Sequence, residues 1–195
     1  MKNHYFILRH GETIYQTKKK DFIYPSWLDN PPIKLIEKSK KNLRKLAKKI
    51  KKEKIDLIYS SDIFRTRQTA KIVARKLELK INFDKRLRDI NLGIYYRKRK
   101  EEFWQKFPRY SLKRFSQRPA EGESWLDCQK RMLKFLKEID KRHKNKNILI
   151  ISHGDPLWLL EGAVKNWSFK KILKIKIYSK REENCAEIDF KAQVD

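Results

Sequence analysis

Two His-Gly pairs, His10-Gly11 and His153-Gly154, are the first residues of this sequence whose types suggest chemistry. Each pair closely follows a run of large apolar residues, "FIL" before the first and "ILII" before the second. Four histidines and five glycines among 195 residues would form only about 0.1 such pairs by chance. Each pair is therefore expected at the end of a buried strand. Because the carboxyl ends of parallel strands share one edge of a sheet, we expect the two imidazoles to converge there.

Two arginines accompany these histidines. Arg9 directly precedes His10, and Arg65 lies in the first turn of a helix predicted to follow a third apolar run, "IDLIYSSD" at residues 55–62. On spacing alone, Arg67 is an equal candidate for that place. Guanidinium groups in such a crevice favour a bound anion, and their planar shape matches the paired oxygens of a phosphoryl group. Since neutral imidazole is a competent nucleophile, the cluster favours phosphoryl transfer to a histidine.

Strands that alternate with helices must bring these residues together. Apolar runs predict strands at residues 3–8, in "IDLIYSSD" and in "NILIIS", with two more near a sheet edge in "ILKIKIY" and "CAEIDF". Helical spacing predicts a helix that ends near residue 54 and others over about 62–77 and 123–143. The expected fold is α/β, a three-layer sandwich with a mostly parallel central sheet flanked by helices. The inward-facing residues are expected to be Leu43, Leu46, Ala47 and Ile50, then Ala70, Val73, Ala74 and Leu77, then Cys128, Met132, Phe135, Leu136 and Ile139.

Local signals predict where two of the helices begin. The serines before Asp62, with Asp62 itself, are expected to cap the helix that starts near residue 62. Asp155 and Pro156 fit an N-cap and the first helical position. Residues 85–120 are irregular and rich in arginine and aromatic residues, so we expect an excursion that contains one short helix and faces the substrate. Its aromatic side chains are expected to pack on the helix and roof the pocket rather than stack on bases.

The composition limits the classes of protein to consider. A net charge of +26 suggests an anionic partner, but the lysines are scattered over nearly every segment, which disfavours a nucleic-acid protein without excluding one. No apolar run is long enough to span a membrane, so no membrane partner is expected. Cys128 and Cys185, far apart and outside any C-x-x-C pattern, suit free thiols of a cytoplasmic protein. The histidines and acids form no known metal-binding pattern, so we expect neither a metal nor a cofactor.

Five short blocks stand in order along the chain: "RHGET" at 9–13, "SSDIFRTRQTA" at 60–70, "LRDINLG" at 87–93, "EGES" at 121–124 and "SHGD" at 152–155. Together they resemble the histidine phosphatase superfamily, also called phosphoglycerate-mutase-like. The stretch "LIEKSKKN" departs from the family pattern. The resemblance implies one phosphoglycerate-mutase-like domain over residues 1–195 and a metal-independent phosphomonoester hydrolase without a cofactor. Its substrate would be a phosphorylated small molecule.

The resemblance also implies roles for individual residues. His10 would be the nucleophile that becomes a phosphohistidine, which water then hydrolyses. Arg9, Arg65 and His153 would bind the phosphoryl oxygens, and Gly154 would join them at the anion. These residues come from the first, second and last of the five blocks.

Two positions carry residues that differ from the family's usual ones. Asp89 stands where a glutamate usually donates the proton to the leaving oxygen, so a shorter acid is expected to act there. Asp155, close to His153, is the competing acid. Gln16 stands where an asparagine often touches phosphate, and it carries the same amide on a longer arm.

Hydrolysis is the favoured activity, and two alternatives stay open. One is a phosphoglycerate-type mutase, which would have to shield the phosphohistidine from water. The other is a catalytically weak basic module that grips phosphorylated protein or RNA, which the charge of +26 and the aspartate at position 89 would suit. The sequence leaves the substrate and the oligomeric state open.

Overall fold

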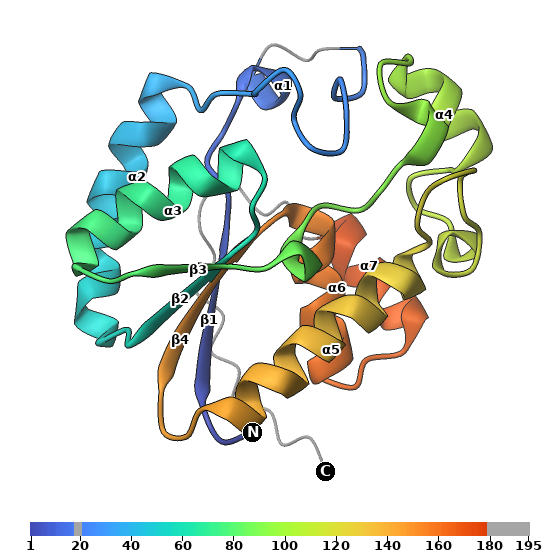
Figure 1. The fold of residues 1–195 in the computed structure, drawn as a ribbon. Helices are drawn as coiled ribbons and strands as arrows, with labels where there is room; N and C mark the ends of the chain where they lie inside the picture. Colours follow the sequence, from blue (N-terminus) through green and yellow to red (C-terminus); the bar gives the residue numbers. More distant parts are fainter. Residues whose placement is uncertain (18–20, 179–195) are drawn as a thin grey trace.

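Four parallel strands form the centre of the molecule. The computed structural model describes residues 1–17 and 21–178. The strand order is β1-β4-β2-β3, and every neighbouring pair is parallel (Figure 1). The expectation of a mostly parallel sheet is confirmed. The strands are β1 (His4–Arg9), β2 (Leu57–Ser60), β3 (Ile81–Phe83) and β4 (Asn147–Ser152).

Helices cover both faces of the sheet and complete the expected three-layer sandwich (Figure 1). Strand β4 shows why its sequence is an unbroken apolar run. Ile148 and Ile150 join the core on one face, whereas Leu149 and Ile151 join the core on the other. A strand that is buried on both faces needs apolar residues at every position. On one face lie α2 (Glu37–Ile50) and α3 (Phe64–Leu77), and on the other lie α5 (Trp125–Arg142), α6 (Gly154–Val164) and α7 (Phe169–Tyr178).

The inner faces of α2, α3 and α5 are those that the sequence predicts. Every expected inward residue of α5 is buried, including the free thiol of Cys128. The expected residues of α2 and α3 are also buried, except Leu46 and Leu77, which are partly buried against the same core. The apolar spacing alone therefore identified which face of each helix packs on the sheet.

The prediction of an edge strand at residues 172–178 is wrong, because this segment belongs to α7. Its apolar positions fit either period, and Ile172 packs so closely on α6 that a Cβ at Gly162 would lie 2.6 Å from its side chain. The neglected signal was Ser168, whose Oγ accepts a hydrogen bond from the Lys171 amide at 3.3 Å, as a helix-capping serine does. The strand expected at residues 185–190 lies outside the described residues.

The predicted capping residues of two helices are also wrong. Helix α3 begins at Phe64, and Asp62 does not cap it but accepts two hydrogen bonds from the Arg88 guanidinium, at 2.7 and 2.5 Å. Helix α6 begins at Gly154 with His153 as its N-cap, so Asp155 and Pro156 lie inside the first turn. Proline is tolerated there because first-turn amides have no partner within the helix. Strand β3 was not predicted; it is only three residues long.

Residues 85–120 form the expected excursion with one short α-helix, α4 (Lys100–Lys106). Phe103 of α4 and Phe107, the residue just after it, pack with Tyr95 and Ile23, so the excursion shares a small core with the segment that follows α1 (Ile14–Thr17). The expected packing of aromatic residues on this helix is confirmed for Phe103 and Phe107. The described residues also contain four short 3-10 helices: η1 (Lys51–Glu53), η2 (Lys85–Leu87), η3 (Gly93–Tyr95) and η4 (Leu112–Phe115).

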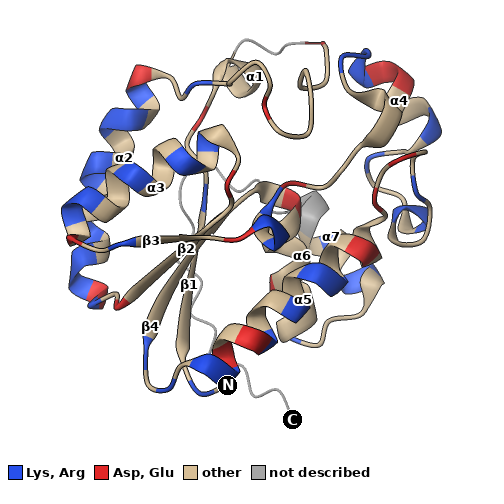
Figure 2. Cartoon of the chain, in the orientation of Figure 1, with Lys and Arg blue, Asp and Glu red and all other residues tan. Residues whose placement is uncertain are grey.

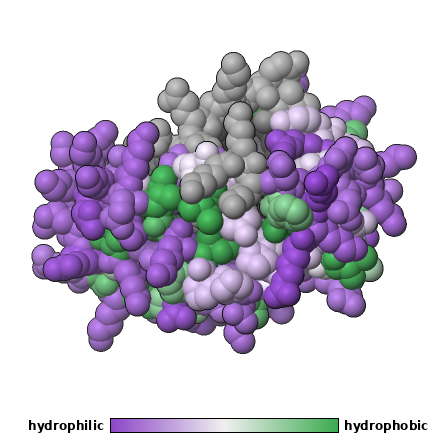
Figure 3. Space-filling view, turned by 90° about the horizontal axis from the view of Figure 1, so that it is seen from above, coloured by the Kyte–Doolittle hydropathy of each residue, from purple (hydrophilic) through white to green (hydrophobic). Residues whose placement is uncertain are grey.

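The surface carries the charge on several elements at once. Figure 2 shows Lys and Arg along α2, α3, α4 and α5 rather than on one of them. Seen from above Figure 1, hydrophobic surface lies between two hydrophilic flanks (Figure 3). None of the helices in residues 1–17 and 21–178 combines the length and the apolar character that crossing a bilayer requires.

Candidate active site

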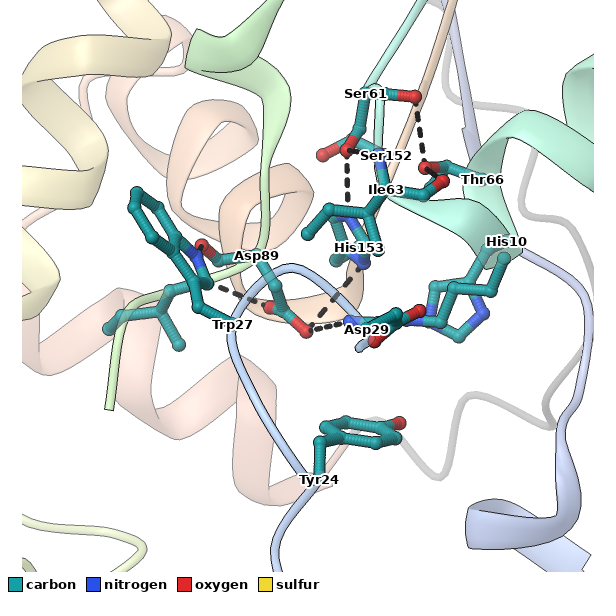
Figure 4. A network of polar contacts seen from close by, with 12 residues as sticks. His10, Tyr24, Trp27, Asp29, Ser61, Ile63, Thr66, Asp89, Ser152 and His153 are labelled. Carbon is teal, nitrogen blue, oxygen red and sulfur yellow. Dashed lines mark hydrogen bonds and ion pairs between the residues drawn. The ribbon is translucent and has the colours of Figure 1, made fainter. Parts of the chain in front are cut away.

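The two predicted histidines meet at the carboxyl edge of the sheet. Strands β1 and β4 are neighbours in the register Arg9 to Ser152, so the residues that follow them, His10 and His153, stand side by side. Their ring centroids are 5.2 Å apart in an edge-to-face arrangement. Figure 4 shows both imidazoles gathered with the carboxylates of Asp29 and Asp89. Two residues that are 143 positions apart thus share one site because their strands are adjacent.

His10 is held in a defined tautomer. Its Nδ1 lies 2.8 Å from the Gly11 carbonyl oxygen, which can only accept, so Nδ1 carries the proton. Its Nε2 accepts a hydrogen bond from Arg65 Nε at 3.2 Å. Burial, together with the charges of Arg65 and Arg9, holds the pKa of His10 well below its usual value. The ring is therefore neutral near pH 7, with its Nε2 lone pair directed at Arg65.

The backbone beside His10 is clamped between α2 and α3. The Gly11 amide donates to Thr69 Oγ1 of α3 at 3.0 Å, and the Glu12 amide donates to Ser39 Oγ of α2 at 2.8 Å. Position 11 has no room for a larger residue, because a Cβ there would lie 2.5 Å from Ser39 Oγ. The glycine of the first His-Gly pair thus lets α2 approach closely enough to fix the imidazole.

Arg65 is the central cation of the site. Its side chain is 2% exposed and donates to His10, to Asp89 Oδ2 at 2.8 Å and to Asp29 Oδ1. The ring of Tyr24 lies 4.5 Å from its Cζ. Arg67, the equal candidate by spacing, is exposed and lies over the ring of Phe83 instead. The structure therefore decides between the two arginines in favour of Arg65.

Asp89 lies beside Arg65 and His153. Its Oδ2 is 3.6 Å from His153 Nδ1, and its backbone carbonyl accepts a hydrogen bond from the Trp27 indole at 2.8 Å. Its side chain is 23% exposed, and desolvation raises its pKa above the usual value despite the opposing charge of Arg65. A raised pKa suits a carboxyl group that must be protonated to donate.

The second imidazole is oriented by a serine. His153 Nε2 lies 3.0 Å from Ser61 Oγ, which also accepts a hydrogen bond from the Ile63 amide at 3.3 Å. Within residues 1–17 and 21–178, the buried Nδ1 of His153 has no hydrogen-bond partner. Burial and then the charge of Arg65 hold the pKa of His153 well below its usual value. This Nδ1 is the group on His153 that is left for a ligand.

Arg9 and Gln16 lie at the edge of the cluster formed around His10 and Arg65. Arg9 is exposed, and its guanidinium rests against Gly154, where an added Cβ would lie 3.5 Å from Arg9 Nε. The charge of Arg9 contributes to lowering the pKa of His10, the residue that directly follows it. Gln16 accepts from the Thr13 amide at 2.8 Å and donates to the Tyr24 hydroxyl at 2.5 Å. Its amide therefore holds the segment that carries Tyr24.

Asp29 is a site residue that the sequence reasoning missed. Its side chain is completely buried against Arg65, and burial raises its pKa. Among the described parts of the chain, its Oδ2 has no hydrogen-bond partner. In the sequence "SWLDNPP", Asp29 resembles an ordinary turn residue, and its positive φ of 54° fits that use. No local signal distinguishes it, since only tertiary packing carries this loop over Arg65.

Asp155, the competing acid, lies next to the cluster. Its Oδ2 accepts a hydrogen bond from the Trp125 indole at 3.3 Å. Its charge is one of the causes that raise the pKa of Asp89. In the first turn of α6, a carboxylate also interacts favourably with the helix dipole. Asp89, which contacts Arg65 and faces His153, is the better placed of the two acids.

No group of three or more His, Cys, Asp and Glu side chains within residues 1–17 and 21–178 is arranged to hold a metal ion. The positive charge at the site comes instead from guanidinium groups. The arrangement of a neutral nucleophilic imidazole, two arginines and a carboxyl group with a raised pKa is suited to transferring a phosphoryl group.

The sequence from residue 5 to residue 191 matches the histidine phosphatase superfamily (branch 1). This chain belongs to that family. It is 30% identical to phosphoserine phosphatase 1 of Hydrogenobacter thermophilus over 84% of this chain and 79% of that protein. It is also 30% identical to the probable phosphoglycerate mutase GpmB of Yersinia enterocolitica, over 80% and 71%. The fold of a mycobacterial glucosyl-3-phosphoglycerate phosphatase is similar, with a TM-score of 0.74, 21% identity, and coverage of 88% and 84%.

In this histidine phosphatase, the fourth sequence block supports the third rather than reaching the anion. Glu123 of "EGES" pairs with Arg131 of α5 at 2.8 Å and accepts from the Asn91 amide at 3.0 Å. Arg131 in turn donates to the Asp89 carbonyl at 3.0 Å. The segment that carries Asp89 is thus fastened to the beginning of α5.

Proposed function

We propose that this chain hydrolyses phosphomonoesters of small molecules through a phosphohistidine on His10. The observation that carries the proposal is the unprotonated Nε2 of a buried, neutral His10, fixed by its Nδ1 contact to Gly11 and directed at Arg65. The phosphatases among its relatives support a small phosphorylated substrate. Membership of the histidine phosphatase family supports the covalent route.

In the first step, His10 Nε2 attacks phosphorus and the P–O bond to the leaving group breaks. Arg9, Arg65 and His153 would bind the three non-bridging oxygens, with the Gly154 amide at the start of α6 as a further donor. In its protonated form, which its raised pKa favours, Asp89 would give its proton to the leaving oxygen. The products of this step are the free alcohol and phosphohistidine.

In the second step, water attacks the phosphohistidine. Asp89 is now a carboxylate and takes a proton from the attacking water, while the N–P bond breaks and His10 recovers its lone pair. Inorganic phosphate leaves, and both residues return to their starting protonation. The Ser61 hydroxyl can donate to His153 Nε2, which keeps a proton on His153 Nδ1 for the phosphoryl oxygens.

The remaining parts of the proposal concern the surroundings of this chemistry. Gln16 would act on phosphate through Tyr24, to which it donates, or directly after that bond opens. The excursion at residues 85–120 would face the leaving group and select it. Guanidinium groups would provide the charge that a metal ion provides elsewhere, so activity is expected to persist in a chelator. The free thiol of Cys128 suits a cytoplasmic enzyme.

Covalent trapping tests the nucleophile. Wild-type protein incubated with a radioactive phosphomonoester and quenched at alkaline pH, where phosphohistidine survives, should retain label. His10→Ala should retain none, whereas His4→Ala, which removes an exposed histidine at the start of β1, should label normally. Label on His10→Ala, or its absence from active wild-type protein, would contradict the proposal.

Mutase activity is a second candidate because the chain is also similar to a probable phosphoglycerate mutase. The two activities share the phosphohistidine and differ in its acceptor, which is water for the hydrolase and a sugar acid for the mutase. Incubation with 3-phosphoglycerate separates them. Released inorganic phosphate indicates hydrolysis, and accumulation of 2-phosphoglycerate without release indicates the mutase.

A further inference from the structure

A second arginine, Arg114 of η4, is buried outside the catalytic cluster. The residue is 4% exposed, and its Cζ lies 4.2 Å from the ring centre of Trp125, 5.2 Å from that of Trp104 and 5.4 Å from that of Phe103. Within residues 1–17 and 21–178, its buried Nη1 has no hydrogen-bond partner. Burying a guanidinium group with an unused N–H donor among aromatic rings costs free energy unless an anion binds to it.

A second unused donor lies beside it. The indole Nε1 of Trp104 is also buried and has no hydrogen-bond partner in the described parts of the chain. Four buried side-chain atoms share this property there, and the other two, on Asp29 and His153, belong to the catalytic cluster. These four atoms therefore fall into two groups, one where the phosphoryl group is proposed to bind and one at Arg114 and Trp104.

The buried Arg65 and the half-buried Arg131 show which partner Arg114 lacks. Arg65 contacts two carboxylates, and Arg131 contacts Glu123. The ion pairs found among the described residues include none to Arg114, and burial lowers its pKa despite the charge of Asp155. Arg109 is exposed, and its Cζ lies 4.8 Å from the ring centre of Trp104, so it adds positive charge near Arg114. Together these features call for an anionic partner at Arg114.

This pair of donors is one indole ring away from the catalytic cluster. Trp125 contacts Arg114 through its ring and donates through its Nε1 to Asp155, two residues after His153. In Figure 1 the segment between α4 and α5, which carries Arg114, lies beside the N-terminal end of α5. A small molecule whose phosphoryl group is at His10 could therefore extend toward Arg114.

We propose that Arg114 and Trp104 bind a carboxylate of the substrate, so that the preferred phosphomonoesters carry a second, carboxylic anionic group. This inference rests on the hydrolase function proposed above. A carboxylate carries one negative charge, which a single guanidinium neutralises, and its two oxygens can accept from the guanidinium and from the indole N–H. A second phosphoryl group would leave a further charge unpaired among the rings.

Matched substrates test the site. O-phosphoserine and O-phosphoethanolamine differ only in the carboxylate, and 6-phosphogluconate and sorbitol 6-phosphate repeat the comparison at a longer spacing. Wild-type protein should favour the carboxylated member of at least one pair by about tenfold or more in kcat/KM, the usual effect of one charge-assisted hydrogen bond. In Arg114→Gln this ratio should fall to near one.

Two variants accompany Arg114→Gln. Trp104→Phe keeps an aromatic side chain but removes the pyrrole part of the indole with its N–H, so it should lower the same ratio about threefold even if Arg114→Gln fails to fold. Lys113→Gln removes one charge from an exposed neighbour on the same short helix and should keep the wild-type ratio. Equal loss of the ratio in Lys113→Gln would mean that general charge, not the buried pair, selects the substrate.

Binding to His10→Ala, measured by titration calorimetry with the same compounds, separates failure of this site from failure of the hydrolase function. If wild-type protein turns over both members of each pair equally, the carboxylate site is wrong and the hydrolase stands. If nothing is turned over but His10→Ala binds the carboxylated compounds more tightly in an Arg114-dependent manner, the site stands and the hydrolase function is wrong. Equal or absent binding in that case would overturn the site as well.

Discussion

Arg65 and Arg114 are both buried, yet their surroundings differ. Arg65 contacts two carboxylates and the edge of an imidazole, whereas Arg114 is enclosed by three aromatic rings. The charge of Arg65 is offset before any ligand arrives, so its first task is to hold His10, Asp29 and Asp89 in place. The charge of Arg114 is not offset in this way. Arg65 organises the catalytic site, whereas Arg114 is suited to binding an anionic group of a ligand.

Replacing Arg65 should have the largest effect of any change that tests this contrast. Arg65→Met removes the shared partner of Asp29 and Asp89, and we expect kcat/KM to fall by about 10³-fold or more. Leaving the buried carboxylate of Asp29 and the half-buried carboxylate of Asp89 unpaired should also lower the free energy of unfolding by about 3–5 kcal/mol. Steady-state kinetics and urea denaturation measure the two effects. A loss of activity without a loss of stability would mean that the carboxylates do not depend on Arg65.

Asp89→Asn should slow the hydrolysis of alkyl phosphates by about 10²-fold or more, because an amide cannot supply the proton that an alkoxide needs. Nitrophenyl phosphate, whose leaving group needs little protonation, should be affected far less. Asp155→Asn is the matched control and should treat both substrates alike. Equal losses on the two substrates in Asp89→Asn would remove Asp89 from the acid role.

The pH dependence of kcat/KM for alkyl phosphates should be displaced toward acid pH. His10 has a pKa well below its usual 6.5 and stays neutral into the acid range, so little activity is lost there. Asp89 has a raised pKa and donates only below it, so kcat/KM for alkyl phosphates should fall as pH rises through that value, above the usual 3.8. Asp89→Asn should abolish this alkaline limb. A limb that persists in the variant must come from another group.

Asp29→Asn should have a smaller effect, in the opposite direction. It keeps an oxygen that can accept from Arg65 but removes a negative charge beside the proposed phosphate position. Inorganic phosphate should therefore inhibit the variant at about tenfold lower concentration. Inhibition at the wild-type concentration would indicate that Asp29 is already neutral in the protein, in keeping with its raised pKa.

Arg114→Met should have the smallest effect on stability. Replacing a buried cation that has no carboxylate partner by an apolar side chain should change the free energy of unfolding by less than about 1 kcal/mol, or raise it. Urea denaturation of both methionine variants gives a direct comparison with Arg65. A loss as large as that of Arg65→Met would mean that Arg114 holds the aromatic cluster together and is not reserved for a ligand.

The sequence predicted the sheet and the meeting of the two histidines, because both follow from apolar runs and from strand ends that share one edge. It could not predict Asp29, whose place on Arg65 depends on a loop held by Tyr24 and Trp27. It could not predict α7 from apolar alternation, since Ile172 and Leu173 satisfy either period until they pack on α6. The pairing of Asp62 with Arg88 likewise needed the course of the chain after β3.

The clamp on Gly11 has a consequence for the lysine-rich helices. Ser39 and Thr69 secure the nucleophile from the inner sides of α2 and α3, while lysines and arginines occupy the outer sides of the same helices. Reactivity and surface charge are therefore encoded by separate positions on shared scaffolding. The lysines and arginines on the outer sides can change in evolution, or be replaced in the laboratory, so long as the hydroxyl groups of Ser39 and Thr69 are conserved.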